Sequence, residues 1–238
     1  MDTTRAARPI PLFLMVLVAF FSALAALAVS NGHDARAHGN AAHKAAAPAH
    51  VSHSSATVSR KELALRSGMR QLWEDHIVWT RLAIISLTTN APDTQATVGR
   101  LLQNQTDIGN AVKPFYGNAA GTELTRQLRQ HILIAADLIA AAKAGDQTKL
   151  ADAQRRWEKN ADDIAKVLAR VNPRHWKLGK MKSELRMHLK LTTDEAVARL
   201  QGKWNADVAA YDKIHRHALH FADLLSSGLV KQFPRRFR

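Results

Sequence analysis

The chain of 238 residues contains no cysteine. This absence excludes a disulfide framework, a thiolate metal site, a cysteine nucleophile and an iron–sulfur cluster. A core of packed side chains must therefore stabilise the fold. Apolar residues make up 46% of the chain, which is enough for one sizeable core.

Proline and the usual enzyme motifs are also scarce. Residues 60–233 contain only three prolines, and no stretch alternates between apolar and polar residues as a strand does. The chain has no glycine-rich phosphate loop, no GxSxG turn and no alternating strand–helix pattern. No nucleophile, base and orienting residue form a recognisable set. The sequence leaves catalysis open and favours a non-enzymatic protein.

The N-terminus carries an export signal. An uncharged run from Leu12 to Val29 follows Arg5 and Arg8. A signal-peptide core has about 7 to 15 apolar residues and a spanning helix about 18 or more, and the length of this run lies at the border between the two. We expect residues 1–30 to be a signal peptide or a signal anchor. The rest would then be periplasmic, or anchored in the inner membrane with its domain on the periplasmic side.

A polar stretch separates this segment from the rest of the chain. Residues 31–59 are rich in Ala, His and Ser and offer no apolar period to bury, so we expect a disordered tether. Imidazoles on such a chain bind metal ions weakly. The tether contains His33, His38, His43, His50 and His53.

Residues 60–238 predict one all-α domain, an antiparallel helical bundle. Apolar residues recur at steps of three and four. A break is placed at Thr192 because Glu195 follows at the spacing of a capping box. The expected helices cover residues 60–89, 94–113, 119–144, 147–171, 177–191 and 193–231.

The bundle is predicted to consist of repeated helical hairpins. The strings NQTDI at Asn104 and NADDI at Asn160 are two copies of one motif, and a shortened echo, NADV, begins at Asn205. In each unit a helix with a central histidine precedes the helix with the asparagine. Stacking of such hairpins buries a continuous core. The central histidines, here named the seam histidines, recur at almost the same interval as the two strings and are His76, His131 and His188.

The seam histidines interrupt apolar rows in the middle of three helices. Buried imidazoles at similar depth on facing helices form a polar layer that binds a small ligand or a metal ion, for which we expect a divalent cation. Alternatively, each histidine only fixes the helix register through a hydrogen bond to Asn104, Asn160 or an aspartate. The spacing matches no HExxH or paired ExxH motif. The candidate metal ligands are His76, His131, His188, His217, His220 and Asp223.

Basic side chains outnumber acidic ones. The formal charge is +14, and residues 60–238 hold 30 basic and 18 acidic side chains. This excess favours polyanions through salt-sensitive attraction. Outside the cytoplasm, anionic lipid or an envelope polymer is the expected partner, and nucleic acid is not. The leading hypothesis is a cell-envelope bundle that binds a ligand or metal ion; the alternative is a membrane- or envelope-associated interaction module that acts through its basic surface.

The chain contains the strings LWEDHIVWTR, RLLQNQTDIGNAVKPFYGNAAG, HILIAADLIAAAKAGD, RWEKNADDIA, HLKLTTDEAVARL and ADLLSSGLVKQFP. Together they resemble a family of exported bacterial all-helical proteins without an assigned function. The resemblance covers residues 62–234 and implies no site residues. Members sometimes carry the label glycosyltransferase or acetylglutamate kinase, but the missing nucleotide-binding pattern argues against both activities here.

Overall fold

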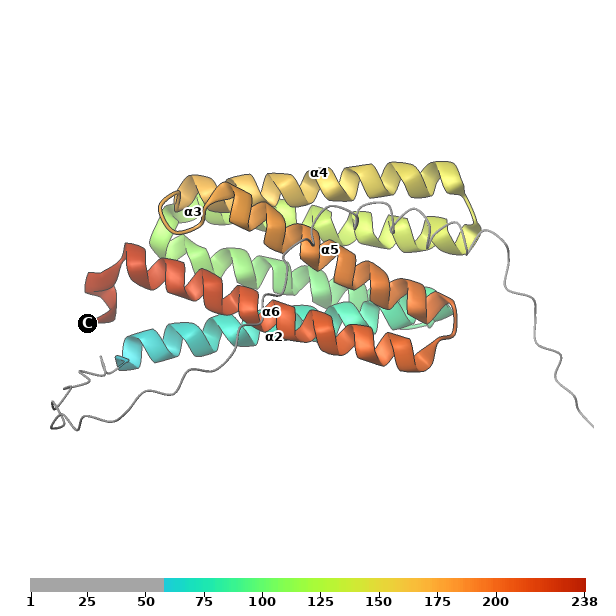
Figure 1. Cartoon of the computed structure of the whole chain (residues 1–238), viewed down its shortest axis with the longest axis horizontal. Helices are drawn as coiled ribbons and strands as arrows, with labels where there is room; N and C mark the ends of the chain where they lie inside the picture. The colour runs from blue at the N-terminus through green and yellow to red at the C-terminus, as the bar shows by residue number, and fades with distance from the viewer. Residues whose placement is uncertain (1–57) are drawn as a thin grey trace, which may run out of the picture.

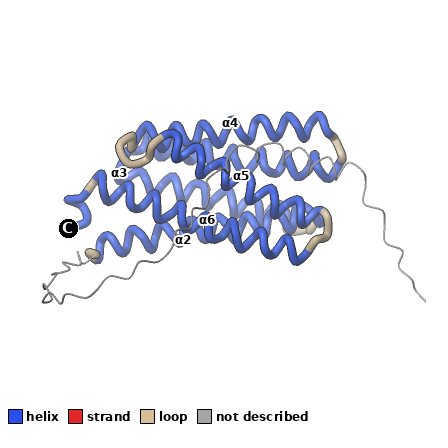
Figure 2. Tube along the Cα trace, viewed as in Figure 1, coloured by secondary structure: helices blue, strands red, loops and turns tan. Residues whose placement is uncertain are grey.

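The computed structural model describes residues 58–238, which are helical apart from short loops (Figure 2). The predicted signal segment, residues 1–30, and the tether up to residue 57 lie outside the described residues. None of the helices in the described part is long and apolar enough to cross a membrane.

The helices form an antiparallel all-α bundle (Figure 1), as the sequence predicts. α2 packs against α3 and α6, α4 packs against α3 and α5, and α5 also packs against α6. The helices therefore close into a ring around a shared core. Their bounds are α2 (Arg60–Thr89), α3 (Thr94–Ala144), α4 (Gln147–Val171), α5 (Leu178–Leu200) and α6 (Trp204–Gln232), followed by the short 3-10 helix η1 (Pro234–Phe237).

Side chains and glycine define the helix ends. Ser59 Oγ accepts a hydrogen bond of 3.2 Å from the amide of Glu62 and caps α2. Gly145 ends α3 in the left-handed conformation with φ 70°. Asp146 Oδ1 then accepts from the amide of Lys149 over 3.0 Å and starts α4. A glycine that ends α3 is directly followed by an aspartate that caps α4, which explains the sharp turn between these two helices.

α3 consists of two helices joined by a kink. Gly117 has φ 82° and ψ 169°, a conformation that L side chains rarely adopt. Pro114 lacks an amide donor and weakens the helix just before this point. The two parts fold back beside each other (Figure 1). The described chain thus forms three helical hairpins: α2 with the first part of α3, the second part of α3 with α4, and α5 with α6.

The predicted break before the last helix is wrong. α5 continues through Thr192, whose hydroxyl donates to the backbone oxygen of His188 over 2.9 Å inside the helix. The Glu195 side chain caps nothing, because it is buried and accepts from Arg81 over 2.9 Å. The chain turns later, at Gly202, where φ is 66°. Thr192 and Glu195 thus have the spacing of a capping box in the sequence, but their side chains make two unrelated contacts in the structure.

The internal repeat is visible in the buried core. Equivalent positions in the three hairpins recur at nearly the interval of the seam histidines, and their side chains belong to one buried cluster. Each hairpin thus contributes matching residues to the centre of the ring. Two such sets are Ile108, Ile164 and Phe221, and Val112, Leu168 and Leu225.

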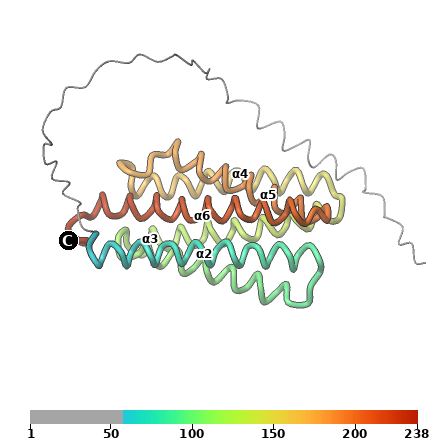
Figure 3. Tube along the Cα trace, turned by 60° about the horizontal axis from the view of Figure 1, so that its bottom comes forward, coloured from blue at the N-terminus to red at the C-terminus, as the bar shows by residue number. Residues whose placement is uncertain are grey.

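The bundle has two different ends (Figures 1 and 3). The start of α2, the kink of α3, the α4–α5 loop and the C-terminal segment meet at one end. The turns between α2 and α3, α3 and α4, and α5 and α6 lie at the other. We name these the kink end and the turn end.

Candidate functional site: a histidine cluster at the centre of the bundle

The three seam histidines converge inside the ring of helices. The ring centroids of His76 and His188 lie 5.6 Å apart, and those of His131 and His188 lie 5.8 Å apart. All three side chains are buried, with exposed fractions of 3%, 4% and 7% in chain order. The repeat in the sequence therefore brings one imidazole from each hairpin to the same region.

The same type of side-chain hydrogen bond joins the two helices of the first and of the second hairpin beside the seam histidine. Asn104 Nδ2 donates to the backbone oxygen of Leu72 over 3.0 Å. Asn160 Nδ2 makes the equivalent bond to Gln127 over 3.1 Å. In both cases the acceptor lies one helical turn before the seam histidine. The amide thus connects the second helix of a hairpin to the first beside its imidazole.

In the third hairpin a histidine takes the place of the asparagine. His217 Nε2 donates to the backbone oxygen of Glu184 over 3.1 Å, and Glu184 lies one helical turn before His188. The predicted echo at Asn205 does not correspond to this position, since its side chain is exposed. The interval from Asn160 to His217 nearly equals that from Asn104 to Asn160, and this match is the sequence signal that identifies the true equivalent.

The hydrogen bonds of Asn160 determine the tautomer of His131. Because Asn160 Nδ2 donates to Gln127, its Oδ1 is the acceptor that faces His131 Nδ1, 2.9 Å away. His131 therefore carries its proton on Nδ1 and keeps a lone pair on Nε2. The Trp157 ring stacks on His131 with centroids 5.2 Å apart.

His76 has a less complete hydrogen-bond environment. Its Nδ1 lies 3.1 Å from Gln105 Nε2, which also contacts the backbone oxygen of Leu101 and Asn104 Oδ1. An amide nitrogen has only two protons for these three contacts. Gln105 Oε1 is buried and has no hydrogen-bond partner among the described residues. A polar group without a partner thus adjoins the imidazole cluster.

His188 occupies the middle of the cluster. Its ring lies between those of His76 and His131 and stacks on His217, with centroids 6.3 Å apart. In the part of the chain that the structure describes, only burial and neighbouring imidazoles act on the pKa of His188, and no hydrogen bond to the ring contributes. Among residues 58–238, the imidazole of His188 is therefore buried without a hydrogen-bond partner of its own.

Burial keeps these imidazoles neutral. Loss of water lowers the pKa of His76 to about 3 and that of His131 to about 4. Burial, followed by the neighbouring imidazoles, lowers the pKa of His188 well below its usual value of 6.5. At neutral pH all three rings are unprotonated, which is the form that coordinates metal ions.

Of the other predicted metal ligands, His217 adjoins the cluster, whereas His220 and Asp223 do not. His220 is exposed, and its Nε2 lies 3.9 Å from Glu184 Oε1. Asp223 accepts two hydrogen bonds from Arg70, over 2.7 and 2.6 Å, on the surface. His217 contacts the cluster but uses Nε2 for the carbonyl of Glu184. Helical spacing alone places His220 and Asp223 near the seam, whereas their helix turns them outward.

Within residues 58–238 no three or more His, Asp or Glu side chains stand in an arrangement that could hold a metal ion. The metal prediction thus has convergent imidazoles in its favour but no preformed coordination geometry. The imidazole rings would have to rotate before their nitrogens could surround one ion.

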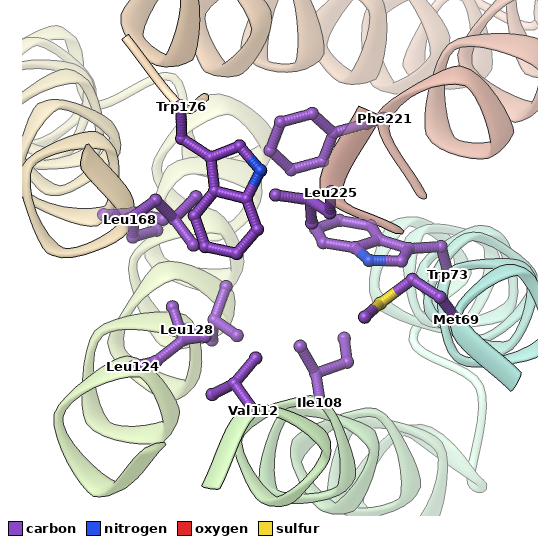
Figure 4. A pocket seen from close by; sticks show the side chains of 11 residues that line it. Met69, Trp73, Ile108, Val112, Leu124, Leu128, Leu168, Trp176, Phe221 and Leu225 are labelled. Atoms are coloured by element: carbon purple, nitrogen blue, oxygen red, sulfur yellow. The ribbon is translucent and has the colours of Figure 1, made fainter. Parts of the chain in front are cut away.

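A small apolar cavity adjoins the histidine cluster through Trp73. Figure 4 shows the side chains that line it. Its volume is about 20 Å³, enough for one water-sized molecule. Trp73 lines the cavity and places its ring edge-on to His76, with centroids 5.4 Å apart. The indole nitrogens of Trp73 and Trp176 have no hydrogen-bond partner among the described residues. The walls are formed by Met69, Trp73, Ile108, Val112, Leu124, Leu128, Ile164, Leu168, Trp176, Phe221 and Leu225.

The structure also shows a buried ionic network that the sequence does not reveal. Arg81 on α2 donates to Glu195 on α5 and to Asp207 on α6, and Arg199 donates to Asp207 over 3.2 Å. Both carboxylates are only 1% exposed. Charges so distant in sequence follow no motif, so only the fold reveals their pairing. The network lies near the turn end and joins α2 to the third hairpin.

No protein-family model matches the chain, and no curated protein and no solved structure is significantly similar to it. The candidate site therefore rests on the geometry of its own residues.

Proposed function

We propose that this protein is an exported, non-enzymatic helical bundle that binds one transition-metal ion through His76, His131 and His188. The observation that carries this proposal is the convergence of three buried, neutral imidazoles from equivalent positions of three hairpins. Neutral imidazole is a ligand preferred by zinc, copper and nickel ions. Proton competition is weak, because the pKa of His76 is about 3 and that of His131 about 4.

Two of the three ring separations among the seam histidines are close to those of imidazoles that share an ion. A metal–nitrogen bond of about 2 Å places the ion about 3 Å from a ring centroid, so imidazoles that share it have centroids about 5 to 5.5 Å apart. The observed 5.6 and 5.8 Å exceed this range only slightly. No hydrogen bond from the described residues restrains the His188 ring, so its rotation would bring its nitrogen towards those of His76 and His131.

The charge of the site favours copper(I) over zinc. Three imidazoles are neutral ligands, so the full charge of the ion remains in a buried environment, and a single charge costs less to bury than a double one. Glu184 places a carboxylate beside the cluster, and Lys180 contacts this carboxylate at 2.5 Å. Its Oε2 lies 3.7 Å from His217 Nδ1, and the His217 ring stacks on that of His188.

Metal analysis of the purified full chain tests the proposal. The five tether histidines are replaced by serine, which leaves only the bundle to bind ions. This protein is loaded with copper(I), zinc(II) or nickel(II), freed of excess ion and analysed. We expect about one ion per chain, with copper(I) retained best, and none once the seam histidines are also changed to asparagine.

Two outcomes would overturn the metal site. One is a metal-free protein after loading; the other is an ion that remains when the seam histidines are replaced. Helix content from circular dichroism confirms that each variant is folded. If the replacements change only thermal stability, the imidazoles serve solely to fix the register of the hairpins.

A further inference from the structure

The kink end of the bundle carries a large excess of basic side chains. Residues 58–61, 113–119, 170–180 and 230–238 form this end and contain no aspartate or glutamate. Their eleven basic side chains are Arg60, Lys61, Lys113, Arg170, Arg174, Lys177, Lys180, Lys231, Arg235, Arg236 and Arg238. Of these, only Arg170 and Lys180 form ion pairs with carboxylates in the described part of the chain.

Direct contacts join these segments into one surface. Arg236 donates to the backbone oxygen of Pro114 over 2.7 Å, which connects the C-terminal segment to the kink of α3. Lys61 donates to the backbone oxygen of Arg238 over 3.2 Å. Gln232 donates to the backbone oxygen of Val171 over 3.2 Å and thereby reaches the α4–α5 loop. The basic groups are therefore held close together by the fold.

The turn end provides an internal comparison. Its segments, residues 88–94, 143–149 and 199–207, contain four basic and three acidic side chains. These charges nearly cancel, and several are paired, as in Lys149 with Asp146 and Arg199 with Asp207. The two ends thus differ by about ten charges. An even coating that only keeps the protein soluble would not produce this asymmetry.

The position of the chain suggests what the kink end faces. α2 begins at this end, so the polypeptide that carries the apolar run from Leu12 to Val29 reaches the bundle here. If that run stays in a bilayer as a signal anchor, one of the two alternatives that its length leaves open, the kink end is the part of the bundle attached nearest to the lipid surface. Aromatic rings add to the fit, since Phe115 and Phe237 stack there, half-buried, with centroids 6.0 Å apart.

We propose that the kink end docks on the surface of a bilayer that contains anionic lipid, with its unpaired Lys and Arg side chains against the headgroups. Each basic residue close to such a surface contributes about 1 kcal/mol. The attraction falls within about 10 Å at 0.1 M salt, so only the kink end and not the turn end takes part. This docking is independent of the metal site.

Site-specific labelling tests the orientation directly, because the chain contains no native cysteine. Leu178→Cys at the kink end and Val208→Cys near the turn end replace side chains that are 44% and 54% exposed. Each full-length variant is labelled with a fluorophore and reconstituted in vesicles whose headgroups carry a nitroxide quencher. Vesicles of phosphatidylcholine alone are compared with vesicles that also contain phosphatidylglycerol.

We expect strong quenching at Leu178→Cys in the anionic vesicles only, its loss in high salt, and little quenching at Val208→Cys. Adding Arg174→Glu and Lys177→Glu should weaken the lipid-dependent signal about tenfold or more. Adding Lys149→Glu and Lys203→Glu, an equal charge change at the turn end, should leave it unchanged.

Equal quenching in both vesicle types, or no effect of the kink-end reversals, would overturn the proposal. So would binding of inorganic polyphosphate to the reconstituted protein with an unquenched Leu178→Cys label. That result would assign the surface to a soluble polyanion.

Discussion

Asn160 donates a hydrogen bond of 3.1 Å to the backbone oxygen of Gln127, across the hairpin that α4 forms with the second part of α3. The same side chain accepts from His131 Nδ1 over 2.9 Å. One amide thus connects two helices and fixes the tautomer of an imidazole. The bond recurs from Asn104 to Leu72, so this connection is a property of the repeat.

Replacing this amide should weaken the bundle. Asn160→Ala leaves the buried Nδ1–H of His131 without its acceptor and removes the donor to the side-chain oxygen of Gln127. We expect a loss of about 3 kcal/mol of unfolding free energy. Urea denaturation followed by circular dichroism measures it. Asn205→Ala, at the exposed echo of the motif, is the control and should change stability by less than about 0.5 kcal/mol. Equal effects of both substitutions would contradict the assigned role of Asn160.

The buried imidazoles should make the metal-free protein sensitive to acid. Because their pKa values in the folded state lie below the ordinary 6.5, with about 3 for His76 and about 4 for His131, the unfolded chain takes up protons first. Stability is then fully present above pH 6.5 and is lost as the pH falls towards the folded values. We expect a loss of a few kcal/mol between pH 7 and pH 4.5.

Thermal unfolding across this pH range measures the effect. The variant with asparagine at all three seam positions should show a much shallower slope than the unmodified chain. The five tether histidines act as an internal control, since serine in their place should not alter the slope. An unchanged slope without the seam histidines would show that other groups control acid unfolding.

Glu195 should titrate with the opposite sign. Burial raises its pKa from 4.5 to about 7, although Arg81 acts to lower it. The stability that it contributes is full below pH 4.5 and is lost as the pH rises through about 7. We expect unfolding free energy to fall by about 1 to 3 kcal/mol between pH 5.5 and pH 8, and Glu195→Gln to remove this decline. The partly exposed Asp194→Asn, one residue away, should not affect it.

A single glycine controls the fit of the buried indole at the kink end. A Cβ at Gly228 would lie 1.9 Å from Trp176 Nε1, so Gly228→Ala must displace a ring that is 1% exposed. We expect a loss of about 2 to 3 kcal/mol from such overpacking. Gly68→Ala, where no atom lies within 4 Å, should instead stabilise α2 by up to about 1 kcal/mol. Calorimetry of both variants measures the two changes in stability and separates the cost of overpacking at Gly228 from the gain in helix propensity at Gly68.

Much of the fold follows from local signals in the sequence. Periodicity and the Gly145–Asp146 stop and start predict the helices over residues 60–89 and 147–171 with the observed bounds. The last boundary does not follow, because the hydroxyl of Thr192 can bond either to a free amide or to the carbonyl of its own helix. Sequence spacing cannot distinguish these two hydrogen bonds.

The sequence predicts only those residues of the candidate site whose positions follow the internal repeat. Nearly equal intervals in the sequence place His76, His131 and His188 at equivalent heights, and their convergence follows. The outward turn of His220 and the pairing of Asp223 with Arg70 depend on which face α6 presents to α2. That choice is made by packing across the whole bundle, so local spacing does not determine it.

X-ray absorption spectroscopy of the copper-loaded chain without tether histidines tests the central claim most directly. The proposal predicts nitrogen ligands at about 2 Å with the outer scattering of imidazole rings, and loss of this signal in His188→Asn. A copper ion surrounded only by oxygen, or an imidazole signal that persists in His188→Asn, would contradict a metal site built from the seam histidines.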